Sequence, residues 1–326
     1  ALTLEAEVAK AVVGQHEVIR LINIAVFARG HVLLEGDVGV GKTTLLRAFA
    51  RAIGGAYARI EGTVDMMPAD LIYHTYLDAD GRPRVEPGPL LQHGAALATF
   101  FFNEINRTRP QVQALLLRAM AERSVTAFNR EHALPHLLVF ADRNRVEKEE
   151  TFELAAAARD RFLFEVSMEV PSDVAIQRAL LLDPAFHDAD ALVGRVQPNV
   201  LRHDEMNTIA AAIQASVQAS ATMQDYLHRL WQATRDPVAQ GVAVDGVDMS
   251  RLIAAGASPR AASMLSRAAR VAAWLAGRDY LVPEDVQAVF APALSHRIFF
   301  KPVYEMRRAE IADALMSDIL ARVGAP

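Results

Sequence analysis

Short apolar runs separated by helical stretches make up the first 196 residues of the chain. Several of these runs are apolar without alternation, which is typical of strands that helices cover on both faces. Strands that alternate with helices in this way predict an α/β domain with a parallel sheet. The five predicted strands are His31 to Leu34, Tyr57 to Ile60, Ala98 to Phe102, Leu137 to Ala141 and Phe162 to Met168.

The character of the chain changes near Gln197-Pro198-Asn199. Beyond this point, alanine-rich segments carry apolar residues at helical spacing, and no run has the pattern of a convincing strand. We therefore predict two domains, an α/β core over residues 1–196 and an all-helical domain over residues 197–326. The apolar positions that define the first helices of the second domain are Ile209, Ile213, Val217, Met223, Leu227, Leu230 and Trp231.

The segment Gly36-Asp37-Val38-Gly39-Val40-Gly41-Lys42-Thr43 fits the phosphate-loop pattern of Gly, four residues, Gly, Lys and Thr. A predicted strand precedes it, and a predicted helix from Thr44 to Ile53 follows it. Glycines let backbone N–H groups turn toward phosphate oxygens, and the start of the helix adds positive potential. A glycine-rich turn with an incidental lysine is the weaker alternative. We expect the loop and Thr44 to bind a nucleoside triphosphate, with Lys42 at the β- and γ-phosphates and Thr43 on Mg²⁺.

A second polar site follows the predicted strand that ends at Phe102, where Asn103-Glu104 come next. Ligands of α/β proteins bind at the C-terminal edge of the sheet, so Glu104 can polarise an attacking water there as a general base. The alternative role for Glu104 is a helix cap after the strand. Asn103 stands where Asp would help to hold hydrated Mg²⁺, and a neutral amide predicts weaker metal binding.

Two further polar residues follow the same logic. Asn144 comes just after the strand that ends at Ala141, where an amide can hydrogen-bond the γ-phosphate and the attacking water; as an isolated residue it would more often be part of a turn. Arg161 opens the last predicted strand. It is either a surface ion pair or an arginine finger for the γ-phosphate of a neighbouring subunit, and spacing alone does not choose between them.

The composition excludes several classes of protein and site. With no cysteine among 326 residues, disulfides, thiolate metal sites and a cysteine nucleophile are ruled out. The net charge of −5 argues against a protein whose main task is to grip nucleic acid. The longest apolar runs fall far short of the ~20 residues of a membrane helix, and the first residues carry no secretory signal. We therefore expect a cytoplasmic protein without membrane insertion.

Together these segments resemble the AAA+ ATPases, and within them the MoxR family of the helix-2-insert clade. The resemblance runs from Val12-Val13-Gly14-Gln15 to His296-Arg297. Each of these motifs alone is weak evidence for the family. Several motifs in the order in which the family has them are specific evidence. The pieces between those ends are Pro87-Gly88-Pro89-Leu90, Asn103-Glu104-Ile105-Asn106-Arg107, Asp160-Arg161-Phe162, Gly256-Ala257-Ser258-Pro259-Arg260-Ala261 and Gly277-Arg278-Asp279-Tyr280.

The resemblance implies an ATP hydrolase with a P-loop core and a helical lid. Asn144 then corresponds to sensor 1, Arg161 to the finger that acts across subunits, and Arg260 to the sensor-2 arginine of the lid. Gly14 and Gln15 would lie near the adenine. Because AAA+ nucleotides lie between subunits, the resemblance implies a ring, most often a hexamer.

The resemblance also implies partners and surfaces. Two inserted segments, Ala69 to His93 and a hairpin around Val125 to Leu134, should face the ring's central opening or its rim. MoxR proteins commonly work with a separate protein that carries a von Willebrand factor A domain. The segment Asn144 to Phe152 resembles the branch associated with methanol dehydrogenase maturation, so the ATPase would remodel or mature a client protein complex, with metal or cofactor insertion as one form of that work. Tyr73, Tyr76 and Leu77 are apolar residues of the first insertion, which we expect to be loop-like; such residues more often pack locally, and contact with a partner is the alternative.

The chain departs from the family pattern at four places. Asn103 replaces the usual Asp, which puts Mg²⁺ affinity in question. The usual Ala-Thr-Gln-Asn-Pro is Ala141-Asp142-Arg143-Asn144-Arg145 here, and the usual Pro-Glu-Ala before the finger is Ala155-Ala156-Ala157. The stretch Val238 to Ala255 is longer than usual.

Other functions and sites fit these residues less well. A basic cluster of Arg82, Arg84, Arg107 and Arg109 would suit a nucleic-acid motor or loader, but acidic neighbours favour ordinary ion pairs and no nucleic-acid partner. A nucleotide-gated scaffold with little turnover is a second alternative, supported by Asn103 alone. His132 and His136 have metal-ligand spacing only on a helix, and Pro135 between them favours a structural role.

Overall fold

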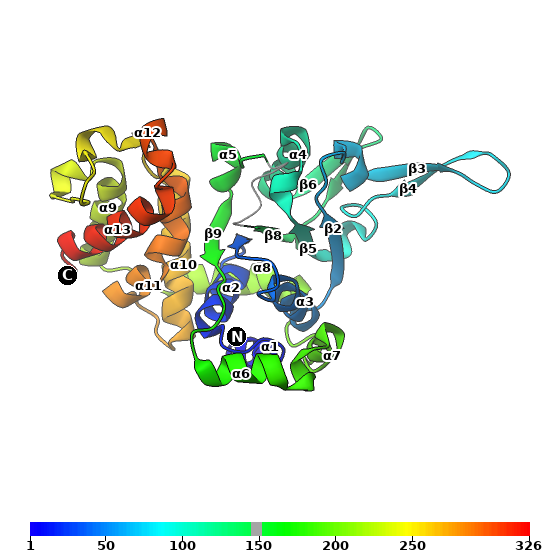
Figure 1. The fold of residues 1–326 in the computed structure, drawn as a ribbon, viewed down its shortest axis with the longest axis horizontal. Helices are drawn as coiled ribbons and strands as arrows, with labels where there is room; N and C mark the ends of the chain where they lie inside the picture. Colours follow the sequence, from blue (N-terminus) through cyan, green and yellow to red (C-terminus); the bar gives the residue numbers. More distant parts are fainter. Residues whose placement is uncertain (145–151) are drawn as a thin grey trace. The chain divides into compact units, whose positions relative to one another are not determined.

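The computed structural model describes residues 1–144 and 152–326, which divide into two compact units. The first unit contains residues 1–161 and 166–207, and the second contains residues 162–165 and 208–326 (Figure 1). The first holds the five-stranded sheet, except residues 162–165 of its last strand, together with the helices of residues 1–207, and the second is mainly helical. In the part of the chain that the structure describes, every helix is too short or too polar to span a bilayer.

The sheet of the first unit is parallel, in the order β2-β5-β8-β1-β9, which confirms the predicted fold class. Burial explains the apolar runs: every residue of β5 is buried, and so are all but the last residues of β1 and β8. All five predicted strands are present. They are β1 (His31–Glu35), β2 (Ala56–Glu61), β5 (Leu97–Asn103), β8 (Leu138–Arg143) and β9 (Phe162–Ser167).

The register of the central strands determines which polar residues meet. Phe102 of β5 pairs with Ala141 of β8, and Leu34 of β1 pairs with Asp142. The residues that end β5 and β8 therefore lie next to one another and beside the loop that leaves β1. Parallel strands thus bring three segments distant in sequence to one edge of the sheet.

Helices of the first unit pack on this sheet; α3, for example, packs on β5. The predicted helix after the phosphate loop is α3 (Lys42–Ile53), which ends at Gly54 with φ 73°. The other helices are α1 (Leu2–Val8), α2 (His16–Phe27), α4 (Pro110–Glu122), α5 (Ala156–Arg159), α6 (Val174–Leu182) and α7 (Ala189–Gly194). Helix α6 has no buried residue, and Leu181 and Leu182 are exposed.

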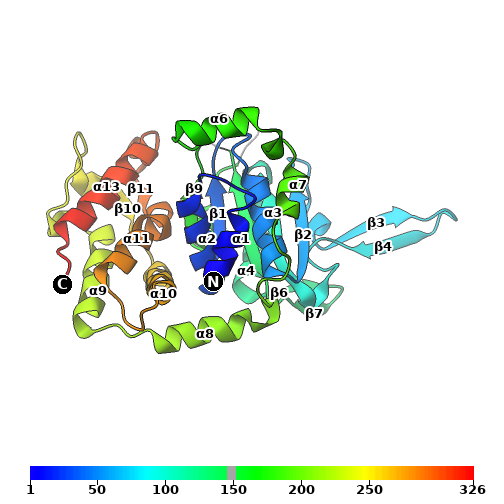
Figure 2. The same ribbon diagram turned by 90° about the horizontal axis from the view of Figure 1, so that it is seen from below.

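Both segments expected as insertions contain antiparallel hairpins. The first was expected to be loop-like, but it forms β3 (Tyr73–Leu77) and β4 (Pro83–Pro87), which project from the unit (Figure 2). The second is the predicted hairpin, formed by β6 (Ser124–Ala127) and β7 (Arg130–Ala133). Phe128 and Asn129 between its strands both have positive φ, as a tight hairpin turn requires.

Apart from residues 162–165 of β9, the second unit consists of helices and one short ladder. Its helices are α8 (Met206–Ser216), α9 (Ala221–Arg235), α10 (Pro259–Leu275), α11 (Pro283–Leu294), α12 (Pro302–Glu305) and α13 (Arg308–Arg322). The ladder pairs β10 (Ile253–Ala255) with β11 (Phe299–Phe300), where the sequence predicted no strand. Two or three residues are too few to show an alternating pattern, and packing rather than periodicity forms this pair.

Candidate functional site

The phosphate loop runs from Gly36 to Gly41, between β1 and α3. Gly39 and Gly41 have φ of 85° and 96°, which side chains with a Cβ rarely adopt. At Gly36 a Cβ would lie 2.4 Å from the Met168 carbonyl oxygen, so the loop can approach the segment after β9 only with glycine. The loop leads into the first turn of α3, whose N–H groups form an anion site.

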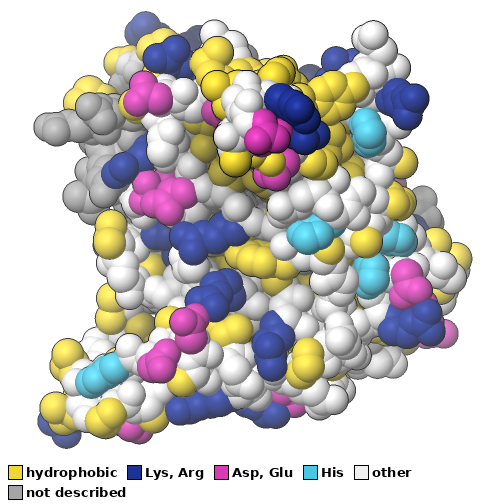
Figure 3. All heavy atoms as spheres, turned by 90° about the vertical axis from the view of Figure 1, so that its right-hand side faces the viewer, with side chains coloured by type: hydrophobic (Ala, Val, Ile, Leu, Met, Phe, Trp, Pro, Cys, Tyr) yellow, Lys and Arg dark blue, Asp and Glu magenta, His cyan; other side chains and the backbone are white. Residues whose placement is uncertain are grey.

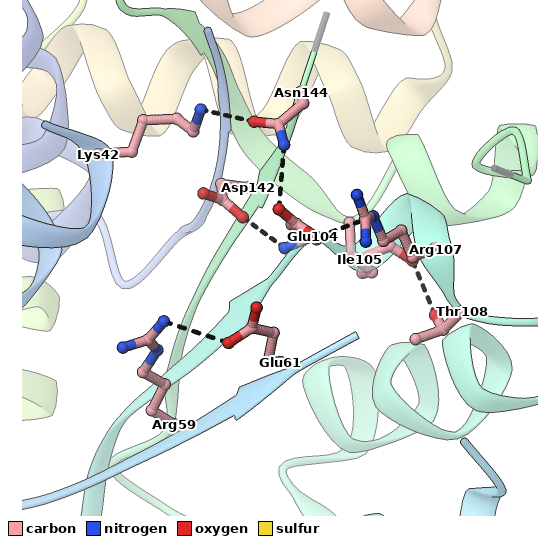
Figure 4. A network of polar contacts seen from close by, with 9 residues as sticks. All are labelled: Lys42, Arg59, Glu61, Glu104, Ile105, Arg107, Thr108, Asp142 and Asn144. Atoms are coloured by element: carbon pink, nitrogen blue, oxygen red, sulfur yellow. Dashed lines mark hydrogen bonds and ion pairs between the residues drawn. The ribbon is translucent and has the colours of Figure 1, made fainter. Parts of the chain in front are cut away.

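Lys42 lies at the centre of the site and is 7% exposed. Its ammonium Nζ donates to the carbonyl oxygens of Gly36 at 2.7 Å and Asp37 at 2.9 Å, and to Oδ1 of Asn144 at 2.8 Å. The lysine thus points back over its own loop toward the end of β8 (Figure 4). This is the position in which an ammonium can meet phosphates that lie in the loop.

Glu104 is held between two donors just after β5. Its Oε1 accepts a hydrogen bond from Asn144 Nδ2 at 3.1 Å, and its Oε2 pairs with Arg107 Nε at 2.8 Å. Glu104 has a left-handed backbone with φ 55°, a conformation that non-glycine residues adopt mainly where the surroundings impose it. Hydrogen bonds therefore join Lys42, Asn144 and Glu104 in a chain, three residues that the sequence analysis selected separately (Figure 4).

Asp142 also belongs to this site, and the sequence analysis gave it no role. Its side chain is buried, at 1% exposed, and its Oδ1 accepts a hydrogen bond from the backbone N–H of Glu104 at 2.6 Å. Desolvation raises the pKa of Asp142 to about 6, although Lys42 opposes that shift. The sequence did carry a signal for it, because Asp142 stands at the end of a strand next to the one that ends in Asn103.

Asn103 lies against this carboxylate. With its amide oriented to donate, the nitrogen lies 3.2 and 3.1 Å from the two oxygens of Asp142. Asn103 is 9% exposed and is the last residue of β5. Two positions at which the chain departs from the family pattern are thus in direct contact.

The oxygen atoms at this edge suit Mg²⁺, which prefers carboxylate, hydroxyl and phosphate oxygens to nitrogen or sulfur. Within residues 1–144 and 152–326, no three His, Cys, Asp or Glu side chains are placed to hold a metal together. A cation here would take few protein ligands and would depend on phosphate oxygens and water, as Mg²⁺ commonly does in nucleotide sites. Thr43, Asn103 and Asp142 are the residues that could contribute.

Gly14 and Gln15, expected near the adenine, lie against the segment that follows β9. The Gln15 amide donates to the Glu169 carbonyl oxygen at 2.6 Å. A Cβ at Gly14 would lie 2.7 Å from Pro171, so only glycine permits this approach. The residues before α2 and those before α6 are therefore fixed to one another.

Of the two arginines with predicted roles, Arg161 contacts its own preceding helix, and Arg260 belongs to the second unit. Arg161 is partly buried at the start of β9, and its Nη1 donates to the Ala157 carbonyl oxygen at 2.9 Å. Arg260 is the second residue of α10 in the other unit, after a Ser258 cap. The Arg145 departure and most of the segment 144–152 that resembles the methanol dehydrogenase branch lie outside the described residues.

The two histidines with metal-ligand spacing do not form a metal site with other residues that the structure describes. His132 lies on β7, whereas the ring of His136 packs edge to face on His203 with centroids 5.3 Å apart. Burial lowers the pKa of His136, so its neutral form is favoured. The structural interpretation of these residues is consistent with this packing.

The family is identified by comparison with known proteins. Residues 31–164 match the ATPase family associated with various cellular activities (AAA), and residues 248–319 match an AAA lid domain. Over its full length the chain is 61% identical to Protein MoxR of Methylorubrum extorquens and covers 95% of that protein. It is 53% identical to Protein MoxR of Paracoccus denitrificans, where 99% of the chain and 95% of the relative are covered.

More distant relatives share the architecture. Chaperone MoxR1 of Mycobacterium tuberculosis is 33% identical over 98% of this chain and 81% of its own length. A crystal structure of a protein from Cytophaga hutchinsonii superposes with a TM-score of 0.81 at 29% identity, covering 99% of this chain and 94% of that one.

Proposed function

The chain belongs to the MoxR family of AAA+ ATPases and is an ATP hydrolase, and we propose that it uses the hydrolysis, as an oligomeric ring, to remodel or mature a client protein complex. The observation that carries the proposal is the hydrogen-bonded chain Lys42–Asn144–Glu104. It joins an ammonium, a neutral amide and a carboxylate from three segments at one edge of the sheet, and this supports the roles of Lys42 as the phosphate-binding cation and Glu104 as the general base.

Each residue of the hydrogen-bonded series Lys42–Asn144–Glu104 has a distinct role in the proposed hydrolysis. Residues 36–44 hold the triphosphate through backbone N–H groups, and Lys42 lies over the β- and γ-phosphates. Asn144 can exchange its bond to Lys42 for one to the γ-phosphate, which makes the position of Glu104 sensitive to the nucleotide. Glu104 accepts a proton from the attacking water. Thr43 and the carboxylate at the end of the sheet would hold Mg²⁺, and the charge of that ion would offset the charge of the phosphates.

Assembly into a ring is supported by the surface of the first unit. Helix α6 exposes Leu181 at 73% and Leu182 at 77%, a pair of large apolar residues that a neighbouring copy would cover. A heterologous contact closes into a ring when the rotation between neighbouring copies is a whole fraction of a turn. In such a ring, Arg161 would act on the nucleotide of the adjacent subunit, and Arg260 would couple the helical unit to its own nucleotide. We propose a hexamer.

The client and the adaptor are proposed from the relatives. The chaperone name of the Mycobacterium tuberculosis relative supports work on a protein. The resemblance of residues 144–152 to the branch associated with methanol dehydrogenase maturation suggests methanol dehydrogenase as the client, and the family resemblance suggests a separate von Willebrand factor A domain protein as the adaptor. The face from which the β3–β4 hairpin projects carries hydrophobic, basic and acidic side chains side by side (Figure 3), as protein contacts do, and among the described residues it forms no continuous basic surface.

Steady-state ATPase assays and calorimetry with two variants test the hydrolysis site. Lys42→Ala should remove nucleotide binding because it deletes the cation that meets the phosphates. Glu104→Gln should keep binding and reduce turnover by about 10²–10⁴-fold, because only the general base is lost. Glu122→Gln, an exposed carboxylate paired with Arg118, is the control and should match wild type. Equal ATP affinity of wild type and Lys42→Ala would contradict the assignment of the phosphate loop.

A further inference from the structure

The ends of β5 and β8 place Asn103 and Asp142 side by side, and the two form one hydrogen-bonded pair. We propose that Asp142 supplies the carboxylate for the nucleotide-bound Mg²⁺ that the family pattern places at position 103, so that the charge has moved from β5 to the adjacent strand β8. The inference rests on the proposed ATP site. It names the residue that replaces the missing Asp.

Strand register brings the two positions together. Phe102 and Ala141 are paired residues of parallel neighbours, so the next residues, Asn103 and Asp142, are adjacent on the same edge. A carboxylate at position 142 therefore lies next to the place that a carboxylate at position 103 would take. The two positions are on neighbouring strands, at the same level along the strand direction.

The chemistry of the pair requires one acid and one amide. With the Asn103 amide turned so that its nitrogen faces Asp142, that nitrogen donates to both Asp142 oxygens, at 3.2 and 3.1 Å; in the opposite orientation only oxygen atoms would face one another. A carboxylate can only accept, so an Asp at position 103 beside Asp142 would place two anions in contact in a buried place. Asn103 and Asp142 together thus keep one negative charge and one hydrogen-bond donor at this place. Either departure from the family pattern alone would leave two carboxylates or none.

The same carboxylate reaches the catalytic base through the backbone. Oδ1 of Asp142 accepts from the N–H of Glu104, which holds the left-handed turn that aims the Glu104 side chain toward Asn144. Asp142 therefore connects the proposed cation site with the proposed general base. An amide at position 142 could keep this backbone contact through its oxygen, but it would remove the negative charge, so the two contributions can be separated experimentally.

Exchange of the two side chains tests the inference. We would prepare Asp142→Asn, Asn103→Asp and the double variant, and measure Mn²⁺ affinity in the presence of ADP by electron paramagnetic resonance. Asp142→Asn should weaken Mn²⁺ binding about 10- to 100-fold. The double variant restores one acid and one amide, so its Mn²⁺ affinity should return to within about threefold of wild type. Asn103→Asp alone should lower the melting temperature because like charges then meet.

The control is Glu61→Gln. Glu61 ends the neighbouring strand β2 and pairs in register with Asn103, but its exposed carboxylate lies toward Arg59 at 3.6 Å (Figure 4). This variant removes the same charge from the same edge and should leave Mn²⁺ affinity unchanged. An equal loss in Glu61→Gln, an unchanged affinity in Asp142→Asn, or a folded double variant as weak as Asp142→Asn would overturn the inference.

Binding of a fluorescent ADP in the presence of EDTA separates this inference from the proposed function. All variants that melt cooperatively should bind the nucleotide without metal, because residues 36–44 are intact. If wild type itself bound no nucleotide, the ATP site would be wrong. If wild type bound ADP and Mn²⁺ while Asp142→Asn bound both equally well, the ATP site would stand, and Asp142 would only position Glu104.

Discussion

At the scale of single residues, the site depends on a buried anion that works against folding. Asp142 is 1% exposed, and burial raises its pKa from 3.8 to about 6. The folded state therefore binds this proton more tightly than the unfolded chain does. Above pH 6 the charged carboxylate in the folded state costs stability, by about 3 kcal/mol for a shift of about two pKa units.

Removing this charge should stabilise the protein at high pH. Because the unfolded carboxyl titrates near 4 and the folded one near 6, the free energy of unfolding of wild type falls as the pH rises from about 4 to about 6. Asp142→Asn lacks this loss. We expect it to melt several degrees above wild type at pH 8, at about 2–4 °C per kcal/mol. The difference should shrink toward pH 4.

Thermal melts at both pH values measure this effect. Glu61→Gln removes an exposed carboxylate at the same edge and should change the melting temperature little at either pH. A variant Asp142→Asn that is less stable than wild type at pH 8 would mean that hydrogen bonds of the carboxylate outweigh its desolvation. A gain in stability that accompanies a loss of metal affinity is expected of a residue retained for function.

At the scale of elements, periodicity predicted the sheet and the helix of the phosphate loop. Continuous apolar runs such as Phe100-Phe101-Phe102 are typical of central strands buried on both faces, and their alternation with helical stretches predicted a parallel sheet. Pattern could not predict the ladder of β10 and β11, because strands of two or three residues have no period.

The candidate site was predictable only in part, for a similar reason. Lys42, Glu104 and Asn144 follow strands directly, and strand ends of a parallel sheet share one edge. Asp142 and Arg107 also touch Glu104, but their contacts depend on register and side-chain direction, which spacing does not give. The adjacency of Asn103 and Asp142 follows from the pairing of Phe102 with Ala141, and the sequence alone does not give this register.

The β3–β4 hairpin is the element best placed to contact a protein partner. Tyr76 is 46% exposed and Leu77 is 70% exposed, whereas Tyr73 at the base packs on Phe128 with ring centroids 5.1 Å apart. Exposed apolar residues on a projecting hairpin contribute little to the core. They are free to contribute to an interface, where aromatic residues often dominate.

Replacing Tyr76 and Leu77 together by Ala should separate partner contact from catalysis. We expect wild-type basal ATPase activity and assembly, with lower methanol dehydrogenase activity in cells that carry the variant. Val238→Ala, which changes an exposed apolar residue of the 238–255 stretch, is the comparison. Full dehydrogenase activity in the hairpin variant would place the contact surface elsewhere. A loss in Val238→Ala alone would point to that stretch.

At the scale of the whole molecule, a single polypeptide supplies the hydrogen-bonded group of Lys42, Glu104 and Asn144. Arg161 lies outside that group. Its Nη1 contacts the Ala157 carbonyl oxygen on the preceding helix. A ring allows such an arginine to reach the nucleotide of the next subunit, where its charge would stabilise the transition state. Catalysis would then be a property of the interface between two copies.

Mixing two inactive variants tests this arrangement. Arg161→Ala should bind ATP normally and hydrolyse it about 10³-fold or more slowly, as loss of an arginine finger does. In rings mixed 1:1 with Glu104→Gln, about one quarter of the interfaces join an intact Glu104 to an intact Arg161 across the same heterologous contact, so about a quarter of wild-type turnover should return.

Assembly of each mixture is checked by native mass spectrometry, and Arg118→Ala, which changes an exposed arginine of an i, i+4 pair, serves as the control with wild-type activity. Full activity of pure Arg161→Ala would exclude a finger role. Mixed rings without recovery would place Arg161 and Glu104 in the same catalytic unit, because complementation between chains requires that the two residues act from different subunits.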